Sequence, residues 1–118
     1  MQDFVILFHQ MPPGCDRNDH WDLMLRNEDQ LLTWAIDSNP LTVNHACGER
    51  LPDHRLKYLE FVGEISDGRG WVEQIAKGKY RWLGNESSEQ WTVELEFPEG
   101  KKLLVELREA VSFRFHWL

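Results

Sequence analysis

The strongest constraint on the fold is a period-two alternation of apolar and polar residues. Between positions 90 and 97, apolar residues occupy every odd position and polar residues every even one. Successive side chains of a β-strand point to opposite faces, so this pattern predicts a strand with one buried face. Comparable strand signals lie at 4–8, 20–26, 30–36, 61–65, 71–77, 79–83, 90–97, 101–108 and 111–117. Eight or nine short strands with hardly any helix predict an all-β fold, either a small antiparallel β-barrel with long connecting loops or a sandwich.

Prolines, glycines and short polar segments predict where these strands end. Connections are predicted at 12–19, 27–29, 37–52, 67–70 and 98–100, and Gly78 is predicted to separate two strands. The consecutive prolines Pro12 and Pro13 have no backbone N–H to donate, so the first connection is expected to be an irregular loop. Pro52 suits the first position of a helix, so a short helical turn is expected from Pro52 to Leu59.

Length and charge limit the classes of partner. A chain of 118 residues is long enough for one hydrophobic core, and we expect one domain spanning 1–118. Its net charge of −7 argues against broad, charge-driven binding to nucleic acid or to an anionic membrane surface. No apolar run approaches the roughly 20 residues that span a bilayer, and the first residues do not have the pattern of a signal peptide. We therefore expect a cytoplasmic protein with no membrane partner, whose Cys15 and Cys47 are reduced thiols.

Three residues in or directly after the first two strand signals have side chains that commonly bind metal ions. His20 and Asp22 stand two positions apart, so their side chains leave the same face of a strand with Cα atoms about 6–7 Å apart. His9, at the end of the first apolar run, can complete a set of two imidazoles and one carboxylate that suits a divalent transition metal. The alternative is that these are ordinary solvated side chains. A weaker zinc candidate is His45 with Cys47 on an extended segment.

A second pair of candidate residues lies further along the chain. His54 and Tyr58 are four residues apart, which places them on one face of either a helix or a strand. His54 can bind a phosphate oxygen or donate a proton to a leaving group, and the Tyr58 hydroxyl can donate a hydrogen bond to a phosphate oxygen. The alternative is a surface histidine beside a tyrosine that covers the core. His116 is expected to be structural or solvated.

These segments form an ordered series of short motifs. The series runs His9, then Asp19-His20-Trp21-Asp22-Leu23-Met24-Leu25, Trp34-Ala35-Ile36 through Pro40, Pro52-Asp53-His54-Arg55-Leu56-Lys57-Tyr58, and Phe61-Val62-Gly63-Glu64-Ile65. In this order the series resembles the 3′-phosphoesterase domain of bacterial DNA ligase D and its free-standing relatives. Each motif is weak alone, but their common order over nearly the whole chain is fairly specific.

The resemblance implies both a site and an activity. It implies a β-barrel that binds Mn²⁺, or another divalent transition metal, through His9, His20 and Asp22. It also implies a phosphate site that includes His54 and Tyr58, with Arg55 as a further phosphate-binding candidate. Members of the family remove a ribonucleoside and then the remaining phosphate from DNA 3′ ends. The expected substrate is accordingly a nucleic-acid 3′ end or a related phosphate ester, and ligase or polymerase end-joining partners would be separate proteins.

Three departures from the family distinguish this chain. Ten residues separate His9 from His20, a longer segment than the family usually has. Met24 stands two residues after Asp22, where relatives carry an arginine that holds phosphate through two charge-assisted hydrogen bonds. The stretch 34–40 has also lost a lysine of the family. Another cation can replace the arginine and lysine of the family in binding phosphate. The candidates are Arg50, Arg55 and Lys57, which flank the His54 segment.

Two functional hypotheses follow, and they belong to different classes. The leading one is a metal-dependent phosphoesterase. The alternative is a non-catalytic module that binds metal or phosphate on the same fold, and Met24 is the feature that favours it. A purely structural β domain would make the match at five polar positions accidental. If the first hypothesis holds, Met24→Arg is expected to improve phosphate binding about tenfold to a hundredfold by restoring charge-assisted bonds.

Overall fold

The computed structural model describes residues 1–65, 68–84 and 87–118 and confirms the all-β prediction. Its described residues form one antiparallel sheet with a single short helix. The strands are β1 (Gln2–Gln10), β2 (His20–Asn27), β3 (Gln30–Ile36), β4 (His45–Arg55), β5 (Gly63–Glu64), β6 (Trp71–Trp82), β7 (Trp91–Glu96), β8 (Lys102–Arg108) and β9 (Ser112–Trp117). The predicted hairpin formed by 90–97 and 101–108 is present as β7 and β8.

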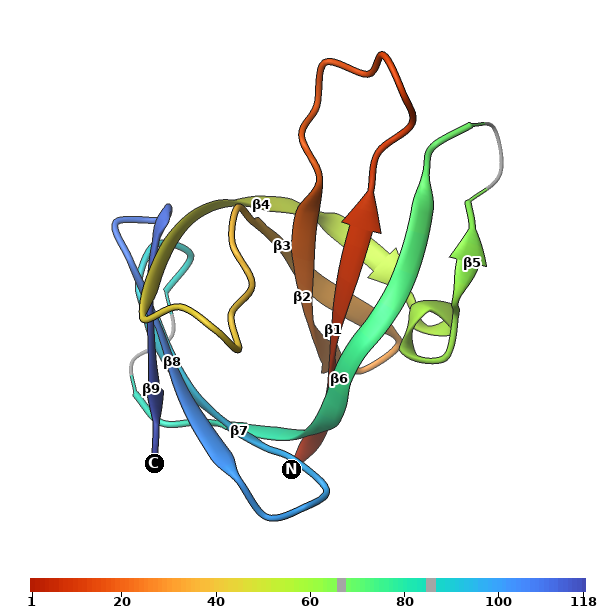
Figure 1. Ribbon diagram of the computed structural model, residues 1–118. Coiled ribbons are helices and arrows are strands. Elements are labelled where there is room, and N and C mark those ends of the chain that lie inside the picture. The colour runs from red at the N-terminus through yellow and green to blue at the C-terminus, as the bar shows by residue number, and fades with distance from the viewer. Residues whose placement is uncertain (66–67, 85–86) are drawn as a thin grey trace.

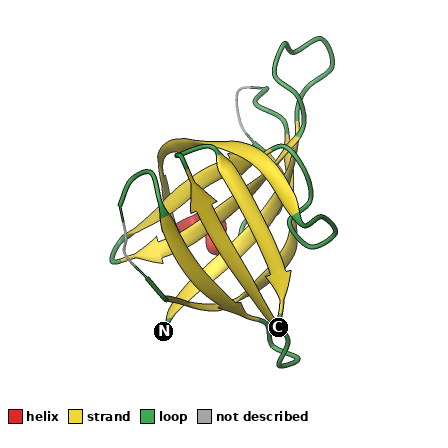
Figure 2. Ribbon diagram, turned by 90° about the vertical axis from the view of Figure 1, so that its left-hand side faces the viewer, coloured by secondary structure: helices red, strands yellow, loops and turns green. Residues whose placement is uncertain are grey.

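The sheet closes into a barrel, as Figures 1 and 2 show. Neighbouring strands follow the order β1-β2-β3-β4-β9-β8-β7-β6, and β6 pairs with β1 to complete the ring. The two-residue strand β5 is added beside the start of β6. Closure pairs the strands that would otherwise be the two edges of the sheet. The long connection between β1 and β2 projects from the barrel (Figure 1).

The barrel interior is filled by the inward-facing half of each alternating pattern. On β2, for example, Leu23 and Leu25 point inward and are almost fully buried. Aromatic rings fill much of the volume, and the centroids of Trp34 and Trp91 lie 4.9 Å apart in an edge-to-face arrangement. The six tryptophans of the chain therefore include core-filling residues, which is the role that a small barrel requires of large side chains.

A second apolar cluster lies on the outer face of β1, β2, β3 and β6. We call it the outer cluster, and its buried members are Val5, Leu7, Met24, Leu31, Ile65 and Val72. The 3₁₀ helix η1 (Leu56–Leu59) and the residues after it cover this cluster. Because β1 and β2 are buried on both faces at this point, Phe4 to Leu7 form a continuous apolar run instead of an alternating one.

The prediction of a long connection at 37–52 was wrong over its second half. The connection spans 37–44 only, because residues from His45 form the eleven-residue strand β4. Pro52 is tolerated in this strand because the register with β3 shifts there: Thr33 pairs with Leu51 and Leu31 with His54. Proline in a sheet is confined to edges and irregularities of this kind. The helical turn accordingly begins at Leu56 and not at Pro52.

Gly78 does not separate two strands as predicted, since β6 is continuous from Trp71 to Trp82. The glycine is needed for a different reason: a Cβ atom at position 78 would collide with the carbonyl oxygen of Glu96 and with the ring of Phe4. The segment 61–65 contributes only the short strand β5. The predicted turn at 67–70 begins at a residue outside the described part of the chain.

Two further expectations concern chemistry and location. Cys15 and Cys47 are both free, as predicted, and both are exposed. In the part of the chain that the structure describes, no helical segment has the length and apolar character needed to cross a membrane.

Candidate metal centre

Three polar side chains meet on the outer face of the barrel, where β1 ends and β2 begins. His9 lies opposite His20 in the register of the two strands. Asp22 follows two residues later and leaves β2 on the same face as His20. One potential ligand atom from each of the three residues lies within 4.8 Å of the others. The side chains of His9, His20 and Asp22 therefore converge as their spacing predicts, and we call them the triad.

Backbone carbonyl groups orient both imidazole rings. Nε2 of His9 lies 2.9 Å from the carbonyl oxygen of Arg69, and Nδ1 of His20 lies 3.1 Å from that of Asn18. A carbonyl oxygen can only accept a hydrogen bond, so these two ring nitrogens carry the protons. In the neutral rings, Nδ1 of His9 and Nε2 of His20 then present their lone pairs toward Asp22. Carbonyl groups or carboxylates commonly hold metal-binding histidines in this manner.

The Asp22 carboxylate is buried between the two rings. Its side chain is 3 % exposed, with Oδ2 3.5 Å from Nδ1 of His9 and Oδ1 3.2 Å from Nε2 of His20. Oδ1 nevertheless accepts no well-formed hydrogen bond. A buried carboxylate oxygen without such a partner is costly, because burial removes its bonds to water. Positive charge among the three groups would compensate this cost.

The pKa values of Asp22 and His9 reflect the interaction between the carboxylate and the rings. Burial raises the pKa of Asp22, but the neighbouring His20 and His9 rings outweigh burial, so this pKa lies below its usual value. Burial lowers the pKa of His9, but the Asp22 carboxylate and the Arg69 carbonyl outweigh that effect and raise it, while the charge of Arg17 acts in the opposite direction. Protons on the histidines or a divalent cation can supply the charge that Asp22 lacks.

The donor set fits a divalent transition metal. Two imidazole nitrogens and one carboxylate oxygen leave further coordination positions open, an arrangement common to catalytic metal sites. A cation among these atoms would use the two ring lone pairs and would also pair the buried oxygen of Asp22. The triad therefore has ligand types that suit such an ion, ring nitrogens that face one point, and a buried carboxylate oxygen that the ion would pair.

Gly70 keeps His9 in this arrangement. Its φ angle is +104°, and a Cβ atom there would collide with the carbonyl oxygen of Gln10 and would lie 3.2 Å from Nε2 of His9. Any residue other than glycine would therefore disturb both the backbone and the histidine ring. Glycine at this position allows the connection before β6 to pass close to β1, so that the Arg69 carbonyl reaches His9.

His54 and Tyr58 lie side by side, as their spacing predicts. Their ring centroids are 5.5 Å apart in an edge-to-face arrangement. Nδ1 of His54 donates a hydrogen bond to the carbonyl oxygen of Pro52 at 2.9 Å, which leaves Nε2 for another partner. Tyr58 packs against the outer cluster. An imidazole nitrogen and a phenol hydroxyl are thus presented together, and both groups can act on a phosphate ester.

This pair is offset from the triad along the sheet. Asp22 pairs with Ala35 of β3, whereas Leu31, four residues away on the same strand, pairs with His54. At about 3.4 Å per residue, the backbone offset along β3 is about 14 Å. Met24 lies on the same face between these two positions. His54 and Tyr58 would act on the same ester as the triad only if the side chains or the substrate span this offset.

Of the three cations suggested as phosphate-binding replacements, Arg55 and Lys57 flank His54 along the chain, whereas Arg50 lies opposite Trp34 in the register of β3 and β4, with its guanidinium 4.8 Å from the centroid of the Trp34 ring. Arg50 is paired with Asp53, with Nη2 of Arg50 2.5 Å from Oδ1 of Asp53. Nζ of Lys57 lies 5.3 Å from the ring centroid of Tyr58, and Arg55 is exposed.

Met24 occupies the face that its spacing predicts but is not accessible there. Its side chain is 1 % exposed and belongs to the outer cluster, beside Val72 and Leu31. An arginine at this position would have to place its guanidinium among apolar side chains or displace the segment that covers them. The structure therefore changes the result expected of Met24→Arg from a gain of phosphate binding to a loss of stability.

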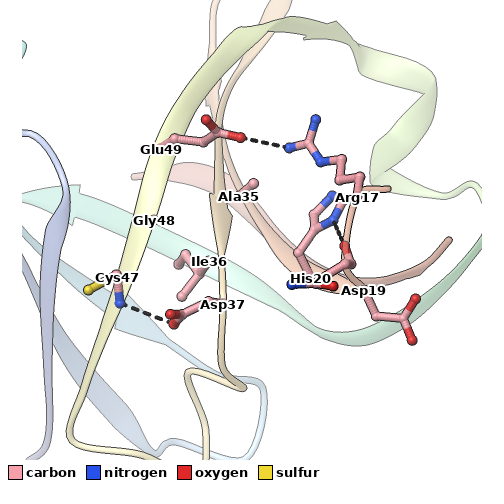
Figure 3. A pocket seen from close by; sticks show the side chains of 10 residues that line it. Arg17, Asp19, His20, Ala35, Ile36, Asp37, Cys47, Gly48 and Glu49 are labelled. Carbon is pink, nitrogen blue, oxygen red and sulfur yellow. Dashed lines mark hydrogen bonds and ion pairs between the residues drawn. The ribbon is translucent and has the colours of Figure 1, made fainter. Parts of the chain in front are cut away.

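A pocket of about 330 Å³ adjoins the triad through His20. Figure 3 shows its walls, which come from the β1–β2 connection, the end of β3 and the start of β4. Ala35, Ile36 and Gly48 provide an apolar side, and Arg17 provides a cation. The pocket has the mixed lining expected of a site for a small polar molecule.

Comparison with known proteins adds no family to this description. No family model matches the chain, and no curated protein matches it at a significant level.

Sequence reasoning missed several residues that shape the site. The carbonyl groups of Asn18 and Arg69 orient the histidines, but a backbone group leaves no sequence signal. Gly70 was interpreted only as part of a turn, although a glycine directly before a strand can also indicate close backbone approach. Arg17 has no strand pattern around it to indicate where its side chain points, and its position three residues before His20 is the only signal in the sequence that brings it near the site.

Proposed function

We propose that the chain is a metal-dependent phosphoesterase that acts on nucleic-acid 3′ ends or related phosphate esters. The observation that carries this proposal is the buried Asp22 carboxylate between two histidine rings whose lone-pair nitrogens face it. The order of motifs along the chain, which resembles the ligase D 3′-phosphoesterase domain, supports the choice of substrate. The reaction class is hydrolysis of a phosphate ester.

In this proposal each residue has a separate role. His9, His20 and Asp22 would hold the ion, and Asp22 supplies the only negative charge among the three. When bound, a divalent ion stabilises the negative charge of a phosphoryl transition state and lowers the pKa of water. His54 would donate a proton to the leaving group, and the Tyr58 hydroxyl would donate a hydrogen bond to a phosphate oxygen. Arg55, which is exposed beside them, would bind a phosphate of the substrate.

One observation favours the alternative of a non-catalytic binding module. Met24 is buried in the outer cluster, so the position two residues after Asp22 has no group that can hold phosphate. A barrel with the triad but without sufficient phosphate contacts would bind the ion and not turn over an ester. Binding of a metal without phosphate release would support this alternative.

Phosphate release from a DNA primer that ends in a 3′-phosphate separates the two functions. We expect the purified protein with Mn²⁺ to release inorganic phosphate, and we expect excess EDTA to abolish the release because the triad then holds no ion. His54→Ala should lower kcat about a hundredfold or more if His54 donates the proton, since general acid catalysis typically contributes that much. The rate is measured by colorimetric phosphate detection.

The control for this experiment is His116→Ala, which removes an exposed histidine of β9. It should leave the rate unchanged. A wild-type protein that binds Mn²⁺ stoichiometrically and releases no phosphate would contradict the proposed hydrolysis and favour the binding module.

A further inference from the structure

The loop between β1 and β2 places an arginine at the mouth of the candidate metal centre. Arg17 lines the same pocket as His20 and is the only Lys or Arg residue among those that line it. It is near enough to the triad for its positive charge to act on His9. Figure 3 shows its guanidinium extending from the loop toward β4, above the histidine. A cation therefore stands beside the ligand set, although the family position for one is filled by Met24.

Hydrogen bonds hold the loop that carries this arginine. The backbone N–H of Met11 donates to Oδ1 of Asp19 at 2.7 Å, which ties the two ends of the loop together. Within it, the N–H of Cys15 donates to the carbonyl oxygen of Pro12 at 3.2 Å. Next to Arg17, the carbonyl oxygen of Asn18 accepts the hydrogen bond that orients His20. The position of the arginine is thus coupled to that of a metal-ligand candidate.

The ion pair that Arg17 makes in this structure can be exchanged at little cost. Nη2 of Arg17 lies 3.0 Å from Oε1 of Glu49, and the two side chains are 43 % and 64 % exposed. Exposed ion pairs of this kind contribute little to stability because water screens the charges and two long side chains must be ordered. A phosphate group can accept two parallel hydrogen bonds from a guanidinium, which is a stronger arrangement.

Two of the carboxylates that line the pocket accept hydrogen bonds from the backbone. Oδ1 of Asp19 accepts the hydrogen bond from Met11, and Oδ1 of Asp37 accepts one from the N–H of Cys47 at 3.1 Å. Their negative charge nevertheless opposes entry of an anion. Binding of a phosphate here therefore needs positive charge from both the ion at the triad and Arg17.

We propose that Arg17 leaves Glu49 and holds the substrate phosphate at the metal centre, replacing the arginine that relatives carry at the Met24 position. This inference rests on the proposed function for its substrate class, a phosphate monoester or diester. It differs from the sequence-based candidates because Arg17 lines a pocket with His20, whereas Arg50 lies over the Trp34 ring and Arg55 and Lys57 flank His54 along the chain. The ten-residue segment between His9 and His20 then has a function, which is to supply the missing cation.

Titration of inorganic phosphate into the Mn²⁺-loaded protein tests this inference without requiring turnover. We expect Arg17→Ala to weaken phosphate binding about tenfold to a hundredfold, because it removes two charge-assisted hydrogen bonds. The affinity for Mn²⁺ should change much less than the affinity for phosphate. The matched control is Arg108→Ala, which removes an arginine from the exposed Arg108–Glu106 ion pair on β8 and makes the same change in net charge. It should leave phosphate binding within about twofold of the wild type.

A second variant should act in the opposite direction. Glu49→Gln releases Arg17 from its present partner and removes a nearby negative charge, so we expect phosphate to bind equally well or several-fold more tightly. Unchanged phosphate affinity in Arg17→Ala would overturn the inference, and so would a metal-loaded wild type that binds no phosphate. If phosphate binds in an Arg17-dependent manner but the 3′-phosphate primer is not hydrolysed, the proposed activity fails while the role of Arg17 stands.

Discussion

Replacing Asp22 with asparagine should weaken the binding of Mn²⁺ at least a hundredfold. The substitution preserves the shape of the side chain but removes the only negative charge among the three candidate ligands. Loss of a residue that merely orients a metal ligand typically costs tenfold to a hundredfold in affinity, so loss of a ligand charge should cost at least as much. Isothermal titration measures the affinity, and phosphate release from the 3′-phosphate primer should be lost in parallel.

The control for this variant is Asp29→Asn in the turn between β2 and β3. Asp29 is exposed, so the same chemical change there should leave the Mn²⁺ affinity unaltered. Urea denaturation of the metal-free proteins shows whether Asp22→Asn retains the native fold. A folded Asp22→Asn protein with the wild-type affinity for Mn²⁺ would show that the ion binds elsewhere.

Met24→Arg should lower the free energy of unfolding by about 3 kcal/mol or more. The side chain of Met24 is 1 % exposed and packs within the outer cluster, so the substitution would bury a guanidinium among apolar groups. Met24→Leu keeps the apolar character and nearly the same volume, and it should cost less than about 1.5 kcal/mol. Urea denaturation of the two variants provides the comparison.

The opposite outcome would also be informative. If Met24→Arg retains the wild-type stability and binds phosphate more tightly, the segment formed by η1 and the residues after it must move away from the outer cluster. The arginine would then take the position that it has in the family that the sequence resembles, and the gain expected from the sequence alone would be correct.

Alternation predicted most of the barrel because most strands have one face in the interior. The pattern at 90–97 gave the boundaries of β7 to within one residue at each end. The same parity argument placed His20, Asp22 and Met24 together on one face of their strand, which is the outer face of β2 in the structure. Strand parity depends on local geometry only, so a single sequence is sufficient to predict it.

The failed predictions concern segments whose structure depends on distant parts of the chain. Strand β4 has a largely exposed sequence that includes Pro52, and its pairing with β3 and β9 makes it a strand. The continuity of β6 through Gly78 depends on the close passage of Glu96 and Phe4. Neither contact can be inferred from local propensity, because tertiary pairing overrides it.

The features of the candidate site also separate into those that local spacing predicts and those that depend on distant contacts. The triad can be predicted from strand parity and from the antiparallel pairing of β1 with β2. The burial of Met24, in contrast, depends on a helix more than thirty residues away. The orientation of His9 by the Arg69 carbonyl joins residues sixty positions apart. A single sequence can thus indicate which ligand types share a face, but not which backbone groups orient them or what covers the neighbouring residues.

Anomalous diffraction from crystals of the protein grown with Mn²⁺ tests the central claim most directly. Data collected at the manganese absorption edge locate the ion independently of any activity. The account predicts one strong anomalous peak among Nδ1 of His9, Nε2 of His20 and the Asp22 carboxylate, with ligand distances typical of a divalent transition metal. Density that shows these three side chains in place with no anomalous peak between them, or a peak bound only by other residues, would contradict it.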